Sequence, residues 1–326
     1  MIDATPLYVT ARGAAYHGDA LDLLARVPDD SIDLVLTSPP FALLRQKDYG
    51  NEAQAEYVQW LMPFCVEVMR VLRDSGSFVL DLGGAYQRGR PVRALYQYRV
   101  LIALCDEIGF RLAQDFFWYN PAKLPAPIEW VNKRKIRVKD AVNTVWWLSK
   151  SDWPKANARR VLKPYSGRME QLLRERECFY TPAERPSGHD VSARFMEDRG
   201  GAIPPNLLEI PNTSSNSQYL RLCREVGVRG HPARFPKELP RFFIAFLTDP
   251  ADTVLDIFAG SNTTGLAAEE MGRAWLAFEA DREYLAASAF RFLDESTVRE
   301  APAVFARLVS GEAEGLEVPQ QARLLR

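Results

Sequence analysis

The chain has 326 residues, of which 47% are hydrophobic and 25% are charged, enough for one large α/β domain with a smaller lobe attached. Charged residues and prolines interrupt every apolar run well before the roughly 20 residues of a membrane-spanning helix, and the first residues lack the pattern of a signal peptide, so we expect a cytoplasmic protein. The four scattered cysteines form no C-x-x-C pair, and only three histidines are present, which argues against a disulfide framework and a His-rich metal site.

The net charge is −1, but the charges are distributed unevenly. Residues 133–168 contain eleven Lys or Arg and two Asp, a balance of +9 that leaves −10 for the rest of the chain. A strongly basic stretch on an acidic body predicts a local polyanion-binding face, and a solvated basic surface is the alternative. The residues expected to hold the polyanion lie at the start of this stretch: Lys133, Arg134, Lys135, Arg137 and Lys139.

The first half of the chain alternates apolar runs with amphipathic stretches. Residues 32–36 predict a buried strand that ends at Thr37-Ser38-Pro39-Pro40. Apolar residues spaced three or four apart between Tyr57 and Val71 predict a helix with one core face. Further strands are predicted at residues 77–80, 116–119 and 144–148. This alternation is typical of an α/β fold with a mostly parallel sheet.

Residues 151–230 break the pattern, because they are polar, weakly periodic and rich in Ser, Asn, Pro and Arg. Such a long irregular stretch predicts an inserted lobe or functional loops. Regular patterning returns with predicted helices at 236–247, from about 264 and at 282–293, and predicted strands at 253–257 and 274–279. We therefore expect two halves of one catalytic domain at 1–150 and 231–300, a target-recognition lobe at 151–230 and a peripheral tail at 301–326.

The sharpest ligand-binding signal reads Asp-Ile-Phe-Ala-Gly-Ser-Asn-Thr-Thr-Gly from Asp256 to Gly265, between a predicted strand and a predicted helix. Glycine and small residues there let the backbone turn tightly and approach a ligand at the carboxyl end of a sheet. The segment lacks the Gly-Lys-Ser/Thr ending of a P-loop and the G-x-G-x-x-G dinucleotide pattern. The residues expected to bind a cofactor here are Asp256, Phe258, Gly260, Ser261, Thr263 and Thr264.

Two carboxylates extend the expected cofactor site. Glu279 ends the next apolar strand, where its side chain is suited to accept hydrogen bonds from both hydroxyls of a ribose. Asp19 precedes a short helix, and its carboxylate is suited to bind an adenine amino group or to cap that helix.

The segment Ser38-Pro39-Pro40-Phe41 has the composition needed for chemistry on an exocyclic amino group. Such a nitrogen is a poor nucleophile because its lone pair is delocalised into the ring. The Ser38 hydroxyl and the Pro39 carbonyl can accept its hydrogens and favour a more tetrahedral nitrogen. The two prolines fix the backbone, and Phe41 can stack on a base swung out of a duplex. A Pro-Pro turn that merely ends a strand is the alternative.

These segments together resemble the β-class S-adenosylmethionine-dependent DNA amino-methyltransferases, in which the catalytic motif precedes the cofactor motif. Residues 256–265 are similar to their D-x-F-x-G-S-G-T-T motif, with Asn262 in place of the second glycine. Asparagine tolerates positive φ better than most residues, so this departure is mild. The resemblance further implies that the segment from His231 to Pro236 closes over the methionine end of the cofactor, with His231 and Pro232 as its cofactor-binding residues. A turn with a structural histidine is the alternative.

The resemblance also implies a role for Asp81, whose carboxylate is expected to hydrogen-bond the Ser38 hydroxyl and polarise it toward the amino group. A carboxylate that caps the turn at Gly83-Gly84 is the alternative. No metal ion is expected in the site.

The similarity runs from about Tyr16 to about Asp294. It implies a Rossmann-like methyltransferase with a mixed, mostly parallel sheet and a smaller DNA-recognition lobe, arranged as a bilobal monomer around a basic cleft. Double-stranded DNA is the implied substrate, and a restriction endonuclease acting on the same site without direct contact is the implied companion. The segments that resemble a cytosine-N4 member of the class are 41–43, 49–51, 81–86, 120–125, 128–147, 185–190 and 287–294.

Serine at the first position of the catalytic motif favours cytosine N4 over adenine N6 as the target, and the adenine enzyme remains an alternative. Glutamine and RNA amino-methyltransferases use Asn-Pro-Pro-Tyr, usually after the cofactor motif, so both the first residue and the order differ here. A catalytically inactive DNA-binding relative is a further alternative. The presence of Ser38, Phe41, Gly260 and Gly265 argues against it.

Overall fold

The computed structural model describes residues 2–42, 54–175, 197–213, 217–294, 296–311 and 315–318. The chain forms two compact units, Met1–Ala156 with Asn206–Arg326, and Asn157–Pro205. The segments 49–51 and 185–190, which carry part of the family resemblance, lie outside the described residues. Within the described part of the chain, no helix is long and apolar enough to cross a membrane.

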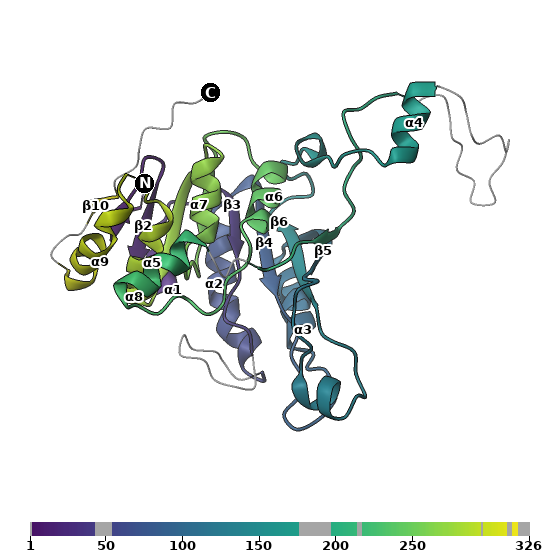
Figure 1. The fold of residues 1–326 in the computed structure, drawn as a ribbon, viewed down its shortest axis with the longest axis horizontal. Helices are drawn as coiled ribbons and strands as arrows, with labels where there is room; N and C mark the ends of the chain where they lie inside the picture. Colours follow the sequence, from purple (N-terminus) through teal and green to yellow (C-terminus); the bar gives the residue numbers. More distant parts are fainter. Residues whose placement is uncertain are drawn as a thin grey trace. The chain divides into compact units, whose positions relative to one another are not determined.

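A ten-stranded sheet in the order β10-β1-β2-β9-β8-β3-β4-β6-β5-β7 forms the centre of the first unit (Figure 1). Strands β6, β1 and β10 run opposite to the other seven, which confirms the mixed, mostly parallel sheet. The strands are β1 Tyr8–Val9, β2 Gly13–His17, β3 Ile32–Thr37, β4 Leu72–Leu82, β5 Arg111–Tyr119, β6 Val142–Ser149, β7 Leu207–Glu209, β8 Thr253–Asp256, β9 Ala274–Glu279 and β10 Leu316–Glu317.

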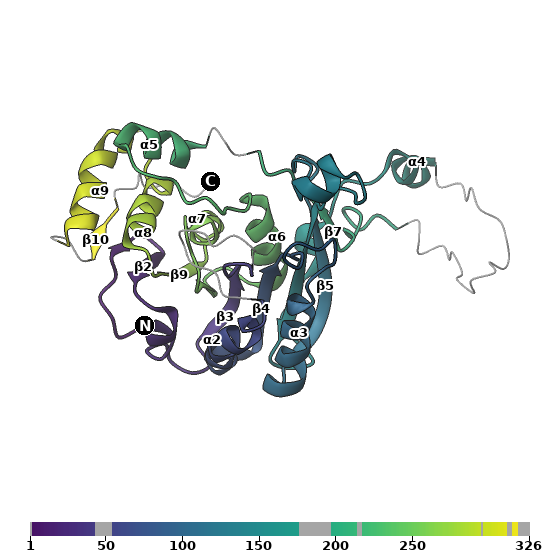
Figure 2. The same cartoon turned by 90° about the horizontal axis from the view of Figure 1, so that it is seen from below.

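Helices cover both faces of this sheet (Figure 2). Neighbouring residues of β4 point to opposite faces, so that Phe78 and Leu80 join one buried cluster and Val79 the other. Burial on both faces explains why the central strands are nearly continuous apolar runs. One face packs against α1 Ala20–Leu24, α2 Tyr57–Val71 and α3 Tyr96–Ala103, and the other against α5 Gln218–Val226, α6 Glu238–Leu247, α7 Thr263–Glu270, α8 Arg282–Ser288 and α9 Ala301–Ser310.

The connections diverge between two adjacent parallel strands, β3 and β8. From β3 the chain crosses through α2 on one face to β4, and from β8 it crosses through α7 on the other face to β9. A crevice therefore opens at the carboxyl ends of β3 and β8, which is where open α/β sheets bind their ligands.

The second unit contains a 3₁₀ turn at Ala158–Val161, the helix α4 Gly167–Glu175 and a bridge between Lys163 and Ala202. No residue of α4 is buried. The second unit contains fewer residues than the lobe expected at 151–230. Residues 206–230 supply β7 and α5 to the first unit. Helix α5 buries Tyr219 and Leu222, an apolar face too short to stand out in the sequence.

The described residues of the stretch 301–326, expected as a peripheral tail, contain helix α9 and strand β10. Helix α9 buries Ala301, Val304 and Leu308 in the core, and β10 pairs with β1 at the edge of the sheet. Spaced three and four residues apart, these side chains form the apolar face of an amphipathic helix. The final residues, 319–326, lie outside the described part of the chain.

Candidate active site

A cavity of about 480 Å³ lies at the carboxyl ends of the parallel strands, in the first unit. It is lined by the residues that follow β2, β3 and β8, by the last residues of β4 and β9, and by the neighbouring pair Trp118 and Asn143 of β5 and β6. The site residues expected from the sequence that line it are Asp19, Ser38, Pro39, Pro40, Phe41, Asp81, His231, Pro232, Phe258, Gly260, Ser261, Thr263 and Glu279.

Strand register places Ser38 beside Asp81. Thr37 of β3 pairs with Leu80 of β4, so the next residue along each strand is brought level with the other. The Ser38 hydroxyl donates to Oδ2 of Asp81 at 3.1 Å. The other carboxylate oxygen, Oδ1, accepts a hydrogen bond from the Asn143 side-chain amide at 3.3 Å. Asn143 has no motif around it, and only the pairing of β4 with β6 brings it here.

The Asp81 carboxylate is only 5% exposed. Burial raises its pKa to about 6, and the hydrogen bonds from Ser38 and Asn143 oppose that rise because they stabilise the charged form. A hydroxyl that donates its proton to a carboxylate keeps its lone pairs available to accept hydrogen bonds from a bound ligand. The pair can therefore both orient an amino group and take up a proton close to neutral pH.

Contacts with Tyr57 and Gly83 fix the position of the segment Pro39-Pro40-Phe41. The Tyr57 hydroxyl donates to the Pro40 carbonyl at 2.8 Å. The Phe41 ring lies over Gly83, where an added Cβ would sit 2.4 Å from Cε2 of the ring. Gly83 is therefore required by the close approach of Phe41, which explains a glycine just after β4.

Two residues expected to bind the cofactor do not line the cavity: Asp256 and Thr264. The Asp256 carboxylate lies buried beneath it and accepts hydrogen bonds from the hydroxyls of Thr37 and Thr264, both at 2.7 Å, and from the Phe258 amide at 3.1 Å. These bonds tie β3, β8 and α7 together at the point where their connections diverge. The contacts of Asp256 thus fix the shape of the floor.

The glycine turn after β8 meets Glu279 from the end of β9. Gly260 has φ of +51°, and an added Cβ would lie 3.0–3.2 Å from the His231 ring, so both conformation and space favour glycine here. Its amide donates to Oε2 of Glu279 at 2.7 Å, while Oε1 accepts from the Asp281 amide at 2.9 Å. Burial raises the pKa of Glu279, and the two amide donors oppose that rise.

Asn262, the departure from the family motif, adopts the left-handed conformation with φ of +52°. Its side-chain oxygen caps α7 by accepting from the Gly265 amide at 3.0 Å, and its side-chain amide donates to the Tyr8 hydroxyl at 2.9 Å. A Cβ on Gly265 would lie 2.2 Å from that oxygen. Asn262 therefore supplies the cap that a glycine could not, and Gly265 provides the space for it.

His231 and Pro232 form part of the cavity wall beside Gly260. The His231 ring hydrogen-bonds the Ala233 carbonyl through Nδ1 at 2.6 Å and packs edge-on against Tyr284. Burial lowers its pKa, which favours the neutral imidazole. Arg234, which belongs to the same segment, also lines the cavity.

Asp19 caps α1, its Oδ1 accepting from the Leu21 amide at 2.8 Å, and it also lines the cavity. Both interpretations of this residue are thus compatible with the structure. An aromatic wall lies in the same cavity, where Phe258 packs against Trp60 and Phe64 of α2 with ring centroids 5.8 and 5.1 Å apart. Trp60 and Phe64 belong to the apolar face of a helix, so their position in the sequence indicated only core residues.

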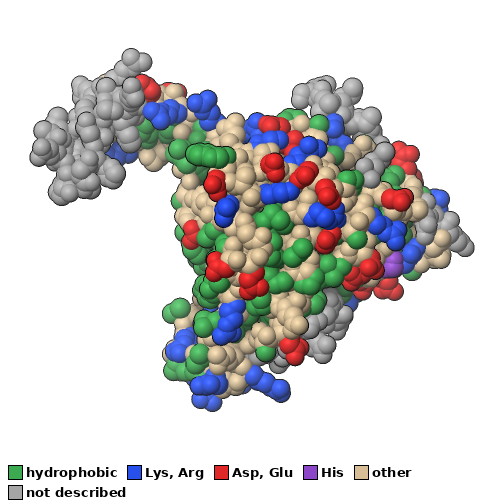
Figure 3. Space-filling view, turned by 180° about the vertical axis from the view of Figure 1, so that it is seen from behind, with side chains coloured by type: hydrophobic (Ala, Val, Ile, Leu, Met, Phe, Trp, Pro, Cys, Tyr) green, Lys and Arg blue, Asp and Glu red, His purple; other side chains and the backbone are tan. Residues whose placement is uncertain are grey.

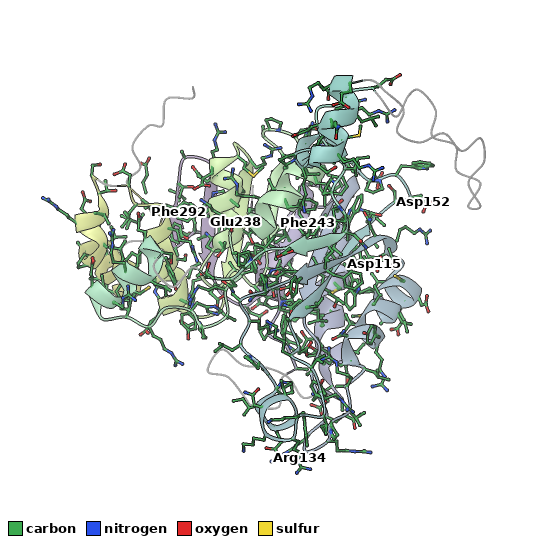
Figure 4. All side chains as sticks on the ribbon, turned by 45° about the vertical axis from the view of Figure 1, so that its right-hand side comes forward. Asp115, Arg134, Asp152, Glu238, Phe243 and Phe292 are labelled. Atoms are coloured by element: carbon green, nitrogen blue, oxygen red, sulfur yellow. The ribbon has the colours of Figure 1, made fainter. Side chains whose placement is uncertain are left out.

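The expected DNA-binding residues do not line the cavity. Lys133 to Lys139 are exposed in the loop between β5 and β6, where Arg134 points outward in Figure 4, and basic side chains gather at this end of the face seen in Figure 3. Lys133 and Arg134 both pair with Glu129. Arg137 donates to the backbone carbonyl of Pro91, and Lys139 donates to those of Pro121 and Lys123.

Two further residues of the basic stretch, Lys150 and Lys155, form ion pairs with carboxylates of the first unit. Lys150 pairs with Asp30, and Lys155 pairs with Asp33, Asp249 and Asp252. These contacts join strand ends and loops of the first unit, so part of the positive charge counted in the sequence is neutralised inside the fold.

A family model described as DNA methylase (N6_N4_Mtase) matches residues 32–290. The chain is 57% identical over 309 residues to the type II methyltransferase M.PvuII of Proteus hauseri, covering 94% of this chain and 92% of the relative. It is 30% identical to M.XycI of Xanthomonas campestris pv. cyanopsidis, covering 86% and 88%. The solved PvuII DNA methyltransferase (cytosine-N4-specific) matches with a TM-score of 0.79 at 49% identity, covering 97% of this chain and 99% of that one. This chain therefore belongs to the N6/N4 DNA methylase family.

Proposed function

We propose that this protein transfers the methyl group of S-adenosylmethionine to the exocyclic N4 amino group of a cytosine in duplex DNA. The observation that carries the proposal is that one cavity contains both the Ser38–Asp81 pair and the Gly260–Glu279 turn. The chain's similarity to M.PvuII and to the cytosine-N4-specific structure supports cytosine over adenine. The class of modification enzyme that we propose is type II, as in a restriction–modification system.

The residues of the cavity fit S-adenosylmethionine. The Glu279 carboxylate suits a pair of ribose hydroxyls, and the wall formed by Phe258, Trp60 and Phe64 suits the face of an adenine. The absence of a side chain at Gly260 suits close approach of the sulfonium region. When bound, this cofactor supplies an electrophilic methyl group on its sulfonium.

Ser38 and Asp81 act on the amino group of the base. The lone pairs of the Ser38 hydroxyl and the Pro39 carbonyl accept its two hydrogens, which draws the nitrogen lone pair out of the ring. The nitrogen gains positive charge as it is methylated and must then lose a proton. Ser38 passes that proton to Asp81, whose pKa of about 6 suits an acceptor at neutral pH.

Entry of the base requires that it leave the stack, since no base within a duplex can reach Ser38 inside the cavity. Phe41 and Trp118 both line the cavity and offer aromatic surface to the extruded ring. We assign recognition of the target sequence to residues 157–205. We assign phosphate contacts to the exposed Lys and Arg side chains from Lys133 to Lys139.

The direct test is to incubate the protein with tritiated S-adenosylmethionine and, in parallel, duplex DNA, RNA and protein. Labelled DNA is then digested to nucleosides and separated by chromatography with mass detection. We expect N4-methylcytosine. Label in N6-methyladenine would move the target to adenine, and label in RNA or protein alone would contradict the proposal.

We also propose that the protein acts as a monomer beside an endonuclease that cuts the same site without touching it. Sedimentation with and without duplex DNA tests the first point. Sequencing of methylated cytosines in a host that expresses the chain gives the site. Plasmid from that host should then resist an endonuclease specific for the same sequence.

A further inference from the structure

The side-chain amide of Asn143 has a donor to spare beyond its contact with Asp81. Asn143 stands two residues before Val145, the strand partner of Asp81, so its side chain projects from the same face of the sheet as the Asp81 carboxylate. One amide hydrogen of Asn143 is donated to Oδ1 of Asp81 at 3.3 Å. Within the described part of the chain its other amide hydrogen has no acceptor, and the half-buried residue lines the cavity. That hydrogen is available to a bound molecule.

The contact with Asp81 decides which end of the Asn143 amide faces the carboxylate. An ionised carboxylate only accepts hydrogen bonds, so the amide nitrogen, and not the amide oxygen, faces Asp81. The Ser38 hydroxyl bonds to the second oxygen of the same carboxylate. Bonds to the two oxygens of one carboxylate place the Ser38 hydroxyl and the Asn143 amide side by side. The cavity thus presents an acceptor, the Ser38 oxygen, next to a donor, the Asn143 N–H.

This order of acceptor and donor is complementary to the Watson–Crick edge of cytosine, the edge by which an extruded base is read. There the N4 amino group donates and the neighbouring ring nitrogen N3 accepts. Thymine and uracil present the reverse order, an accepting O4 beside a donating N3–H. Adenine has the same order as cytosine, with N6 beside N1. A donor that faces the ring nitrogen therefore selects bases that carry an amino group, and it does not decide between cytosine and adenine.

The neighbours of Asn143 have no donor to offer the ring nitrogen. Trp118, its partner on β5, also lines the cavity, but the single indole N–H donates to the Ile210 carbonyl at 2.9 Å. The Ser38 hydroxyl gives its hydrogen to Asp81. Of these three neighbouring side chains, Asn143 is the one that keeps a hydrogen for the base.

We propose that Asn143 donates a hydrogen bond to ring nitrogen N3 of the extruded cytosine while Ser38 accepts from its N4 amino group. This inference rests on the proposed function and names a residue that reads the target base. Two contacts on adjacent atoms fix the rotation of the ring within its own plane, which holds N4 at Ser38. Asp81, bonded to both side chains, sets the spacing of the two contacts.

The test replaces ring nitrogen N3 by C–H. Two duplexes carry cytosine or 3-deazacytosine at the target position of the methylation site, which sequencing of methylated cytosines identifies. The ratio of their methylation rates is measured under single-turnover conditions, with the enzyme below saturation, in the wild type and in Asn143→Leu. The altered reactivity and pairing of 3-deazacytosine act alike on both proteins, so they cancel when the two ratios are compared.

We expect the preference for cytosine to be about 5- to 30-fold smaller in Asn143→Leu, the usual effect of one hydrogen bond whose loss leaves a buried polar group unpaired. Asn143→Ala repeats the comparison without the bulk of leucine and should give the same result. A role of Asn143 confined to Asp81 would slow both duplexes equally and leave the preference unchanged.

Thr144→Val is the matched control, because Thr144 is the next residue on β6, does not line the cavity and donates to the Leu82 carbonyl at 2.8 Å. It should keep the wild-type preference. An unchanged preference in both Asn143 variants would overturn the contact with N3 while leaving the proposed function intact. A wild-type protein that methylates no cytosine at all would overturn the proposed function and this inference with it.

Discussion

The two ends of the cavity are built in different ways. We call the part around Gly260 and Glu279 the cofactor end, and the part around Ser38 and Asp81 the amino-group end. The cofactor end is built mainly on the stretch 256–279, in which Asp256, Asn262 and Glu279 bond to Thr264, Gly265 and Gly260, no more than 19 positions away. Asp256 also bonds to Thr37, and Asp19 and His231 line the cavity from other parts of the chain. The amino-group end joins Ser38 to Asp81 across 43 residues and Asp81 to Asn143 across 62. A local stretch fixes its own geometry, whereas the second arrangement exists only when three strands pair in the correct register.

The largest effect is expected at the local end. Gly260→Val forces a branched residue into φ of +51° and against the His231 ring. Strain and crowding of a few kcal/mol should weaken S-adenosylmethionine binding by about 100-fold in calorimetry. Glu279→Ala, which removes the acceptor of the Gly260 amide, should also weaken it.

Gly272→Val controls for backbone strain, since Gly272 has φ of +77° but open space around it. It should lower the melting temperature and leave cofactor affinity intact. If Gly260→Val and Glu279→Ala both bound the cofactor normally, the cofactor would have to bind elsewhere.

The next prediction distinguishes the chemistry at the amino-group end from cofactor binding. Ser38→Ala removes one positioned acceptor and the route to Asp81, so turnover should fall at least about tenfold. Cofactor affinity should stay normal, because no cofactor-end residue bonds to Ser38 among the described contacts. Single-turnover kinetics with calorimetry on the same preparation measure both. Near-wild-type turnover would remove Ser38 from the chemistry.

A pH profile tests the contact that depends most on register. Asp81 must be ionised to accept a proton, so turnover should fall as the pH drops through about 6. The Asn143 amide stabilises the charged carboxylate, so Asn143→Leu should raise the pKa of Asp81 and move this acidic limb to higher pH. Asn143→Gln should retain part of the wild-type profile. If the acidic limb of the pH profile did not shift in Asn143→Leu, Asn143 would not influence the ionisation of Asp81.

The smallest effect is expected outside the cavity. Replacing Lys133, Arg134 and Lys135 by Ala should weaken specific and random duplexes by similar factors of a few-fold and flatten the salt slope, by about 0.9 for each residue that contacts a phosphate. The pairing of Lys133 and Arg134 with Glu129 limits the loss.

Arg111→Ala is the control, since Arg111 begins β5 at the edge away from this loop and pairs with Asp152. A triple variant that methylated a different sequence would make these residues base readers. If it bound and methylated DNA like the wild type, the basic run would be a solvated surface, and DNA contacts would have to come from elsewhere.

The sequence was most informative where a motif and its contacts are neighbours. The strand, glycine turn and helix from Thr253 to Glu270, and the strand ending at Glu279, lie where the pattern predicted. It was least informative about irregular stretches. The weak pattern of residues 206–230 concealed β7 and α5, and the tail concealed α9, because short apolar faces become visible only against the surface that they cover.

The sequence by itself determined the α/β class, the cofactor turn, the Ser-Pro-Pro-Phe segment and its family, because each depends on residues close together in the chain. Only the tertiary structure decided which charged residues form ion pairs and which lie at the cavity. It neutralised Lys150 and Lys155 in ion pairs and placed Asp256 beneath the cavity. It also brought Asn143 to Asp81 and placed Arg234 among the residues that line the cavity. A charge acts on what lies within a few ångströms, and strand pairing sets those distances between residues far apart in the chain.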